Sequence, residues 1–180
     1  MLTGKNVRLR AMEPEDLTNL VRWMNDPDVI ENLLIDSPLS SVDEKNWFDT
    51  MMKRPSEEHV YMIEVFEDGQ WISAGSTGLI RLDWKNRSTE IGISIGEKKY
   101  WNRGFGREAM QLMLRHAFND LNLNRVSLTV FSTNERAIKA YHAVGFVEEG
   151  RLREDIFKNG RYIDTIIMSV LRSEWQDARV

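Results

Sequence analysis

Two dipeptides, Asp68-Gly69 and Asn159-Gly160, constrain the fold of this 180-residue chain most strongly. Each stands between two runs of β-type residues, and Asp-Gly or Asn-Gly in that position is the strongest short-range signal for a β-hairpin. The flanking runs are "HVYMIEVFE" with "QWISAGSTGLIRL", and "GFVEEGRLREDIFK" with "RYIDTIIMSVL". The chain is therefore expected to form two antiparallel hairpins.

The segment before the first hairpin carries one strand pattern and two helix patterns. Residues 7–10 alternate apolar and basic side chains, which is typical of a strand. Pro14 suits the first turn of a helix, and the next helix is expected to start at Ser41, with Glu44 completing a capping box. Trp23 and Trp47 lie on these helices and are expected in the core.

The segment between the hairpins alternates strand and helix patterns. The strand "TEIGISIG" is followed by the helix "GREAMQLMLRHAFNDL", a strand over residues 126–131, and a helix that Asn134 caps and Gly145 ends. This order of elements predicts an α/β (α+β mixed) sheet in a single domain over residues 1–180.

Composition narrows the classes of function. The net charge of −4 argues against nucleic acid as the main partner, because phosphate binding needs a basic surface. Without cysteine there is neither a disulfide nor a thiol nucleophile, and the three histidines have no metal-ligand spacing, so no metal site is expected. No apolar run approaches the 18 residues of a membrane span, and we expect a soluble, cytoplasmic protein that binds no membrane.

The stretch "YWNRGFGREAM", residues 100–110, places a glycine-rich loop at the start of a helix. The first backbone N–H groups of a helix are unpaired, and the helix dipole adds positive potential there. Gly104 and Gly106 would let a ligand approach the backbone, and Arg103 and Arg107 would add charge-assisted contacts. These features suit a phosphate or pyrophosphate, although a plain turn with solvent-facing arginines remains open.

Two other phosphate-binding motifs do not account for this loop. No G-x-x-x-x-G-K-[ST] occurs, which excludes a P-loop. The residues "GFGREA" fit a relaxed dinucleotide fingerprint, but "GEKKYWN" separates them from the preceding strand. The next strand, "VSLTVF", also ends in Ser-Thr-Asn rather than in a ribose-binding acid.

Three stretches, "YWNRGFGREA", "NLNRVSLTVFSTNERAIKAYHAVGF" and "EGRLREDIFKNGRYIDTIIMSVL", resemble the GNAT superfamily of N-acetyltransferases. The likeness starts at "VRLRAMEPEDL", runs over nearly the whole chain, and is greatest to the branch of ribosomal-protein alanine and spermidine N-acetyltransferases. The resemblance implies a GNAT-like fold, which is a single mixed, mostly antiparallel twisted sheet with helices on both faces. Two central strands would splay apart to hold acetyl-CoA as co-substrate.

The resemblance also assigns the cofactor-binding positions. The pantetheine arm would pair with the strand backbone, the loop would hold the pyrophosphate, and the start of the next helix would touch the cofactor. Trp101 stands where the superfamily usually has Gln or Arg, and Asn102 replaces a frequent glycine. The positions so assigned are Ile93, Ser94, Ile95, Trp101, Asn102, Arg103, Gly104, Phe105, Gly106, Arg107, Asn134 and Ala137.

Two residues are assigned to catalysis by the same resemblance. Tyr141 matches the tyrosine that protonates the coenzyme A sulfur, and a phenol with an ordinary pKa of about 10 carries its proton at neutral pH. A packed core tyrosine is the alternative. Glu90 matches an acid that contacts the acceptor amine or takes its proton through water, and an exposed strand-end carboxylate is the alternative.

The acceptor is expected to be a primary amine, either a protein N-terminus such as that of a ribosomal protein or a small amine. In this family the first two helices and their connection, here "NDPDVIENLLIDSPLSSVDE", build the acceptor site. Its acids (Asp26, Asp28, Glu31, Asp36, Asp43 and Glu44) would attract a cation. Leu33, Leu34 and Ile35 stand where spermidine enzymes are more acidic. Polyamines and amino sugars stay as alternatives.

Two further readings concern catalysis and assembly. The chain could be a non-catalytic sensor of acetyl-CoA or coenzyme A, although a pure binder has no need of the proton donor Tyr141. The long apolar strands of the second hairpin could pair with a second copy, which would make a homodimer.

Overall fold

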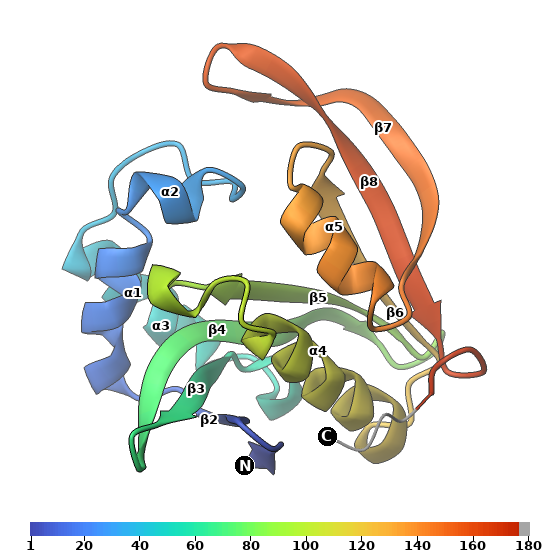
Figure 1. Ribbon diagram of the computed structural model, residues 1–180, viewed down its shortest axis with the longest axis horizontal. Coiled ribbons are helices and arrows are strands. Elements are labelled where there is room, and N and C mark those ends of the chain that lie inside the picture. Colours follow the sequence, from blue (N-terminus) through green and yellow to red (C-terminus); the bar gives the residue numbers. More distant parts are fainter. Residues whose placement is uncertain (177–180) are drawn as a thin grey trace.

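The computed structural model describes residues 1–176 (Figure 1). Its strands are β1 (Leu2–Thr3), β2 (Val7–Ala11), β3 (Tyr61–Glu67), β4 (Gln70–Asp83), β5 (Ser88–Ile95), β6 (Arg125–Phe131), β7 (Val147–Lys158) and β8 (Arg161–Leu171). Its α-helices are α1 (Leu17–Trp23), α2 (Pro27–Ile30), α3 (Ser41–Met51), α4 (Phe105–Arg115) and α5 (Glu135–His142). Short helical turns add η1 (Pro14–Asp16), η2 (Ser56–Glu58), η3 (Lys98–Tyr100) and the π-turn η4 (His116–Asp120).

The described strands form one sheet in the order β1-β2-β3-β4-β5-β6-β8-β7. Every neighbouring pair is antiparallel except β5 and β6, which run parallel. Both predicted hairpin turns occur, since Asp68 with Gly69 joins β3 to β4 and Asn159 with Gly160 joins β7 to β8, all four residues having positive φ. The predicted mixed, mostly antiparallel sheet is confirmed.

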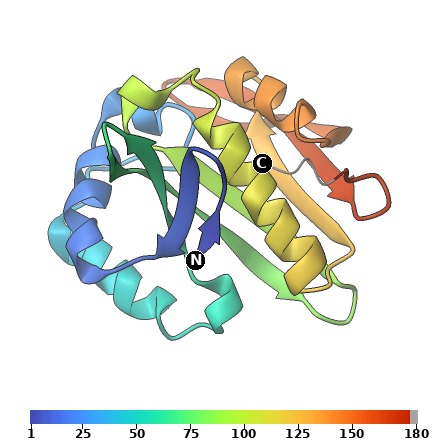
Figure 2. The ribbon, with the colours of Figure 1, turned by 60° about the horizontal axis from the view of Figure 1, so that its bottom comes forward.

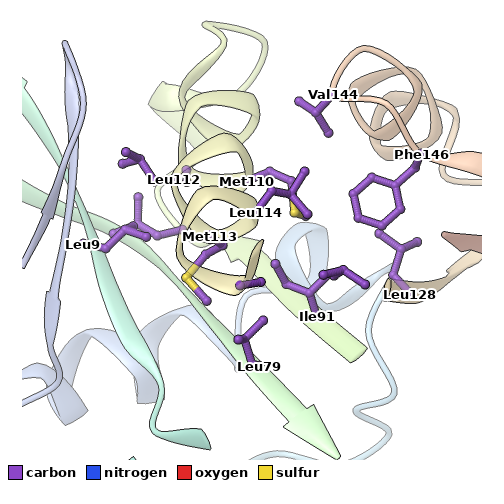
Figure 3. Packing of buried hydrophobic residues seen from close by; sticks show 14 of the residues in the cluster. Leu9, Leu79, Ile91, Met110, Leu112, Met113, Leu114, Leu128, Val144 and Phe146 are labelled. Atoms are coloured by element: carbon purple, nitrogen blue, oxygen red, sulfur yellow. The ribbon is translucent and has the colours of Figure 1, made fainter. Parts of the chain in front are cut away.

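Helices cover both faces of the sheet (Figure 2). The amphipathic helix α4 lays its buried side on one face, where Met110, Leu112 and Leu114 pack with sheet residues such as Leu79 and Ile91 (Figure 3). A second cluster lies between α1, α3 and the other face, and it contains Leu20, Trp23, Phe48, Met51 and Met62. The first cluster extends to α5, so that the helix carrying Tyr141 is anchored on the core.

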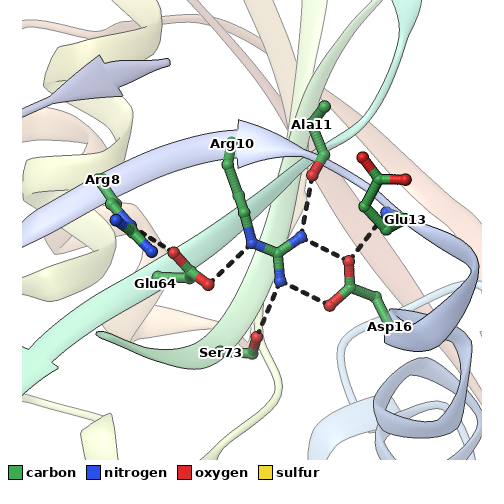
Figure 4. A network of polar contacts seen from close by, with 7 residues as sticks. All are labelled: Arg8, Arg10, Ala11, Glu13, Asp16, Glu64 and Ser73. Atoms are coloured by element: carbon green, nitrogen blue, oxygen red, sulfur yellow. Dashed lines mark hydrogen bonds and ion pairs between the residues drawn. The ribbon is translucent and has the colours of Figure 1, made fainter. Parts of the chain in front are cut away.

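A buried polar network fixes the start of the first helix to the sheet (Figure 4). Arg10 on β2 donates to both carboxylate oxygens of Asp16 at 2.6 and 2.7 Å and to Glu64 on β3 at 2.8 Å. Arg8 also donates to Glu64. Burial would raise the pKa of Asp16, but the hydrogen bond from Arg10 lowers this pKa overall. The network places α1, and with it the segment that leads to α2.

Three local predictions need correction. The cap of α3 is Ser40 with Asp43, one residue before the predicted pair Ser41 and Glu44, because the Ser40 backbone is extended while Ser41 is already helical. Trp47 is 37% exposed rather than in the core, because its side of α3 faces away from the sheet, whereas Trp23 is buried as predicted. The short helix α2 lies in a segment expected only as a connection.

Among residues 1–176, no helix has both the length and the apolar character needed to cross a membrane.

Candidate active site

The strands β5 and β6 pair only at their beginnings. Backbone pairing joins Ser88 to Arg125, Thr89 to Val126 and Glu90 to Ser127, and it stops there. Beyond this point β5 remains paired with β4 up to Ile95, and β6 remains paired with β8 up to Phe131. The two central strands therefore splay apart, as the resemblance implied, and leave a gap between them.

The backbone of β5 has free hydrogen-bonding groups on the side of this gap. The carbonyl oxygen of Gly92 faces β4, where it accepts from Thr77 Oγ1 at 2.8 Å. Since successive residues of a strand turn their polar groups to opposite sides, the groups of Ile93 face the gap. The carbonyl oxygen of Ile95 is already used, because it accepts from the indole Nε1 of Trp101 at 2.7 Å. An extended ligand in the gap could pair with Ile93.

The loop after β5 has the backbone shape of an anion site. Asn102 and Gly104 have positive φ, of 60° and 86°, whereas Arg103 between them does not. Such alternation turns successive N–H groups toward one point. Gly104 is the N-cap of α4 and supplies no capping side chain. The first N–H groups of α4 therefore keep their hydrogen bonds for another partner.

Gly106 identifies where that partner would lie. Gly106 does not have a positive φ, so its conformation does not require glycine. The nearest atoms that a Cβ would meet belong to Ile95 at 3.5 and 3.9 Å, which is ordinary contact. The protein itself thus leaves room for a side chain, and Gly106 lines the cavity described next. A side chain there would occupy the space of a ligand held against the start of α4.

A cavity of about 630 Å³ fills the gap and opens over the loop. It is lined by the strand residues Ile93, Ser94, Ile95, Thr129, Val130 and Phe131, by Trp101, Asn102, Gly104, Gly106 and Arg107 of the loop and helix start, and by Asn134, Arg136, Ala137, Lys139 and Tyr141 of α5 and its cap, among others. Three cations line it, and none of its lining residues in the described chain is Asp or Glu. The cavity fits an elongated ligand with negative charge.

Arg103 and Phe105 differ from the other predicted cofactor residues, because their side chains do not line the cavity. Phe105 is buried in the core under Tyr100. Arg103 turns toward the β3–β4 hairpin and pairs with Glu67 at 3.0 Å. Only the backbones of these two residues remain available to a ligand at the loop.

Glu67 holds this loop from outside the cavity. It accepts hydrogen bonds from Tyr100 Oη at 2.9 Å, Arg103 Nη1 at 3.0 Å and Lys99 Nζ at 3.1 Å. These contacts lower the pKa of Glu67 to about 2. The carboxylate therefore stays charged at neutral pH and fixes the loop from residues 99 to 103 to the end of β3.

Trp101 joins the loop over residues 96–104, called the cofactor loop below, to the helices α1 and α3. Its indole is held by the carbonyl of Ile95 and packs partly against the cluster under α1 and α3. The guanidinium of Arg136 lies 3.9 Å from the centre of its ring. Burial lowers the pKa of Arg136, and the nearby Glu31 opposes this shift. Trp101 and Arg136 together form a rigid, cationic part of the cavity wall.

Tyr141 reaches the same cavity from α5. Its ring packs on the core and lies 5.8 Å from the ring of Phe146, centre to centre. Burial raises the pKa of Tyr141 to about 12, so the phenol keeps its proton at neutral pH. Tyr141 therefore fits both alternatives, the packed core tyrosine and the proton donor, because its ring packs on the core and its side chain also lines the cavity.

Asn134 and Ala137 are brought together at the start of α5. The side-chain oxygen of Asn134 accepts from the backbone N–H of Ala137 at 3.2 Å and caps the helix, as predicted. Both residues also line the cavity. The capping bond leaves the amide nitrogen of Asn134 as the group that a ligand could use.

Glu90 is not among the residues that line the cavity. It lies at the point where β5 and β6 separate, opposite Ser127. Both of its carboxylate oxygens accept from Arg81 Nη1, at 2.7 and 2.8 Å, and the Arg81 side chain is 75% exposed. The structure therefore separates Glu90 from the cavity wall that holds Tyr141 and leaves its catalytic role as a prediction.

Sequence reasoning missed several residues of this site. Arg136 and Lys139 follow the capping Asn134 within one or two turns of α5, and their place just after a residue assigned to the cofactor was a usable signal. Glu67 carried no local signal, because it lies 33 residues before its partner Tyr100. Val29, Leu33 and Leu34 were not missed, since they belong to the segment that the resemblance assigned to the acceptor, and they line the cavity from α2 and its following loop.

Comparisons with known proteins agree with this geometry. A family model described as "Acetyltransferase (GNAT) domain" matches residues 6–147. The chain is 32% identical over 177 residues to "Uncharacterized N-acetyltransferase p20" of Bacillus licheniformis, covering 97% of each protein. It is 32% identical over 172 residues to the spermidine N(1)-acetyltransferase of Vibrio cholerae, covering 96% of each. A crystal structure of spermidine N-acetyltransferase from Vibrio cholerae with CoA and spermine superposes with a TM-score of 0.84 at 29% identity, covering 94% of this chain and 97% of that one.

Proposed function

Because this chain belongs to the GNAT acetyltransferase family, we propose that it acetylates a primary amine carried on a largely apolar, uncharged body, such as a peptide N-terminus. The expected activity itself is confirmed, since the chain is an acetyl-CoA-dependent N-acetyltransferase with the GNAT fold. The proposal concerns the acceptor and the residues that act on it.

The observation that carries this acceptor is the character of the cavity wall. Val29, Leu33 and Leu34 line it from the α2 side, and the described lining residues include Arg107, Arg136 and Lys139 but no carboxylate. A second ammonium group of the acceptor on the α2 side would meet apolar side chains and no carboxylate among the described lining residues. An acceptor with one amine and an apolar neighbourhood meets no such cost.

Acetyl-CoA supplies an activated acetyl thioester when it is bound. The protein residues hold the cofactor in place and protonate the leaving sulfur. The free N–H groups at the start of α4, with Arg107, would hold the phosphates. The backbone of Ile93 would hold the extended arm in the gap. The amine forms the C–N bond, the C–S bond breaks, and the sulfur receives a proton from Tyr141, whose pKa of about 12 keeps the acid form populated.

Glu90 is the proposed acceptor-side group. It stands at the narrow end of the gap, just outside the cavity lining, so it would act on an acceptor amine through water. The proton lost by the amine would pass through water to Glu90, or directly to solvent water if Glu90 only orients the amine, and Tyr141 would regain its proton from solvent. Arg81 holds the carboxylate in place from the exposed side.

A polyamine is the second candidate acceptor, supported by the full-length similarity to the spermidine N(1)-acetyltransferase of Vibrio cholerae. Glu31 and Asp36 lie outside the main cavity, on a second cavity between α2 and the tip of the β7–β8 hairpin. Acids at this rim could receive the distal ammonium of a long polyamine while its reacting amine enters the main cavity.

An assay for thiol release from acetyl-CoA across an amine panel tests the acceptor. The panel contains peptides with different free N-termini, their N-formyl forms as matched controls, spermidine, spermine and an amino sugar. We expect the free peptides to have the highest kcat/KM and the blocked peptides to be inert. A spermidine kcat/KM that exceeds that of every peptide would overturn the first candidate in favour of the second. Thiol release with none of these amines would reject both candidate acceptors.

A further inference from the structure

Lys158 is the one lysine that is buried among residues 1–176, with 7% of its surface exposed. It ends β7, next to the exposed turn Asn159-Gly160, where a solvent-facing lysine would be ordinary. Figure 1 shows this hairpin tip at the same end of the molecule as α2. A buried ammonium needs partners, so its contacts indicate why it is there.

The ammonium of Lys158 is bound by the loop that follows α2. It donates to the carbonyl oxygen of Leu33 at 2.6 Å and to that of Ile35 at 3.0 Å. The carboxylate of Asp36 lies 3.7 Å away and is largely exposed. Two short hydrogen bonds to carbonyls with a nearby negative charge are a set of partners that repays the loss of water around an ammonium. The two partner segments are 123 and 125 residues apart in the chain.

The loop that Lys158 holds is part of the cavity wall. Leu33 and Leu34 both line the main cavity, and Leu33 also packs against the cluster to which Trp101 belongs. Residues 32–35 belong to no strand or helix that would set their conformation. Lys158 bonds their carbonyls directly, so it supplies the order that regular secondary structure does not.

A second lysine fixes the other end of the same segment. Lys98 on η3, beside the cofactor loop, pairs with Asp26 at 2.8 Å and with Asp28 at 2.6 Å at the start of α2. The segment from residue 26 to residue 36 is therefore tied at its start to the cofactor loop and at its end to the hairpin tip. The Lys98 side chain is exposed, whereas Lys158 is buried, so the contacts of Lys158 are expected to hold the segment more strongly than those of Lys98.

We propose that Lys158 is a positioning residue for the acceptor, and that it acts by holding residues 33–36 as a preformed wall of the acceptor side. Lys158 does not touch the acetyl donor, so its loss weakens acceptor binding without weakening acetyl-CoA binding. The inference rests on the proposed function only in that the acceptor contacts Leu33 and Leu34.

Lys158→Met tests this role, because methionine retains the apolar stem and removes the three donors. With the best amine of the panel, we expect the amine KM to rise on the order of tenfold, the effect of losing hydrogen bonds to a charged group. The acetyl-CoA KM is expected to stay within about twofold, because Lys158 does not line the main cavity. Lys45→Met is the matched control, since Lys45 is exposed on α3 and pairs only with Asp49.

Backbone hydrogen exchange provides a readout that needs no acceptor. In the amine-free protein, Lys158→Met is expected to speed the exchange of amides in residues 32–36, while those of the cofactor loop stay protected. Faster exchange with every panel amine inert would leave the anchor standing and reject the proposed function. Unchanged exchange together with an unchanged amine KM would overturn the positioning role. Equal rises in both KM values would overturn it too, because they indicate general damage to the fold.

If Lys158→Met does not fold, Lys158→Gln replaces it, because the shorter amide can reach at most one of the two carbonyls. The same rise in amine KM and the same faster exchange are expected at smaller size. An amine KM and an exchange pattern equal to those of the unmodified protein would overturn the proposal.

Discussion

The two halves of the active site are built in different ways. The cofactor half comes mainly from one stretch of chain, residues 91–107, together with the first turns of α5. The acceptor half joins α2 and its following loop to a hairpin tip more than 120 residues later. The first half is thus encoded by local sequence, while the second depends on contacts that only the complete fold makes.

The largest expected effect falls where the two halves meet, at Tyr141. We expect Tyr141→Phe to lower kcat by about 10²–10³-fold, the usual contribution of a positioned acid, with the acetyl-CoA KM nearly unchanged. The ring and its contact with Phe146 are retained, so the thermal stability is expected to change little. Tyr162→Phe, on the exposed face of the terminal hairpin, is the control. Unchanged turnover of Tyr141→Phe would show that the residue only packs.

Glu90 tests whether the acceptor half contains its own base. If Glu90 takes the amine proton, Glu90→Gln lowers kcat by about 10²-fold and removes the acidic limb of the pH–rate profile. If Glu90 only orients the amine, kcat falls less and the limb remains. Arg81→Met is the matched control, because it removes the partner of Glu90 and keeps the carboxylate. A wild-type profile in Glu90→Gln would reject both roles.

Gly106 tests the cofactor half by filling it. Gly106→Ala adds a Cβ that makes only ordinary contact with Ile95, so we expect the acetyl-CoA KM to rise by about tenfold, equivalent to 1.4 kcal/mol. The amine KM is expected to change little. Gly150→Ala is the control, since a Cβ at Gly150 meets nothing within 4 Å and Gly150 lies on β7, outside the residues that line the cavity. Equal acetyl-CoA KM values in the two variants would contradict the placement of the phosphates at α4.

The same contrast explains how much the sequence could predict. Gly104 and Gly106 act through their own backbone, and Asn134 caps the helix that begins at the next residue, so these positions can be predicted from neighbouring residues. Trp101 lines the cavity, but its bond to Ile95 and its contact with the guanidinium of Arg136 could not be predicted from spacing.

Long-range partners account for what the sequence did not predict. Arg103 looked like a phosphate ligand because it stands in the loop, but Glu67 on β3 turns its side chain away. Glu90 was assigned to the acceptor amine, but it pairs with Arg81 at a bulge of β4 and lies outside the cavity lining. Lys158 had no local signal, because the carbonyls that it binds lie more than 120 residues earlier in the chain. In each case a charge is paired with a group that only tertiary structure brings near.

Glu67 should give the smallest effect and the sharpest comparison, because Glu149 provides a matched carboxylate on the other side of the molecule. Each has its pKa lowered to about 2, Glu67 by Tyr100, Arg103 and Lys99, and Glu149 by Arg125 and Ser169. A carboxyl whose pKa falls on folding, here from an ordinary 4.5, stabilises the protein above pH 4.5 and loses that effect as the pH falls toward 2. Glu67→Gln and Glu149→Gln are therefore both expected to flatten the decline of Tm over this range. Only Glu67→Gln is expected to raise the acetyl-CoA KM, by about twofold to fivefold, because only Glu67 holds the phosphate loop. An equal rise in both variants would mean that the loop is held by its own backbone and that Glu67 contributes stability alone.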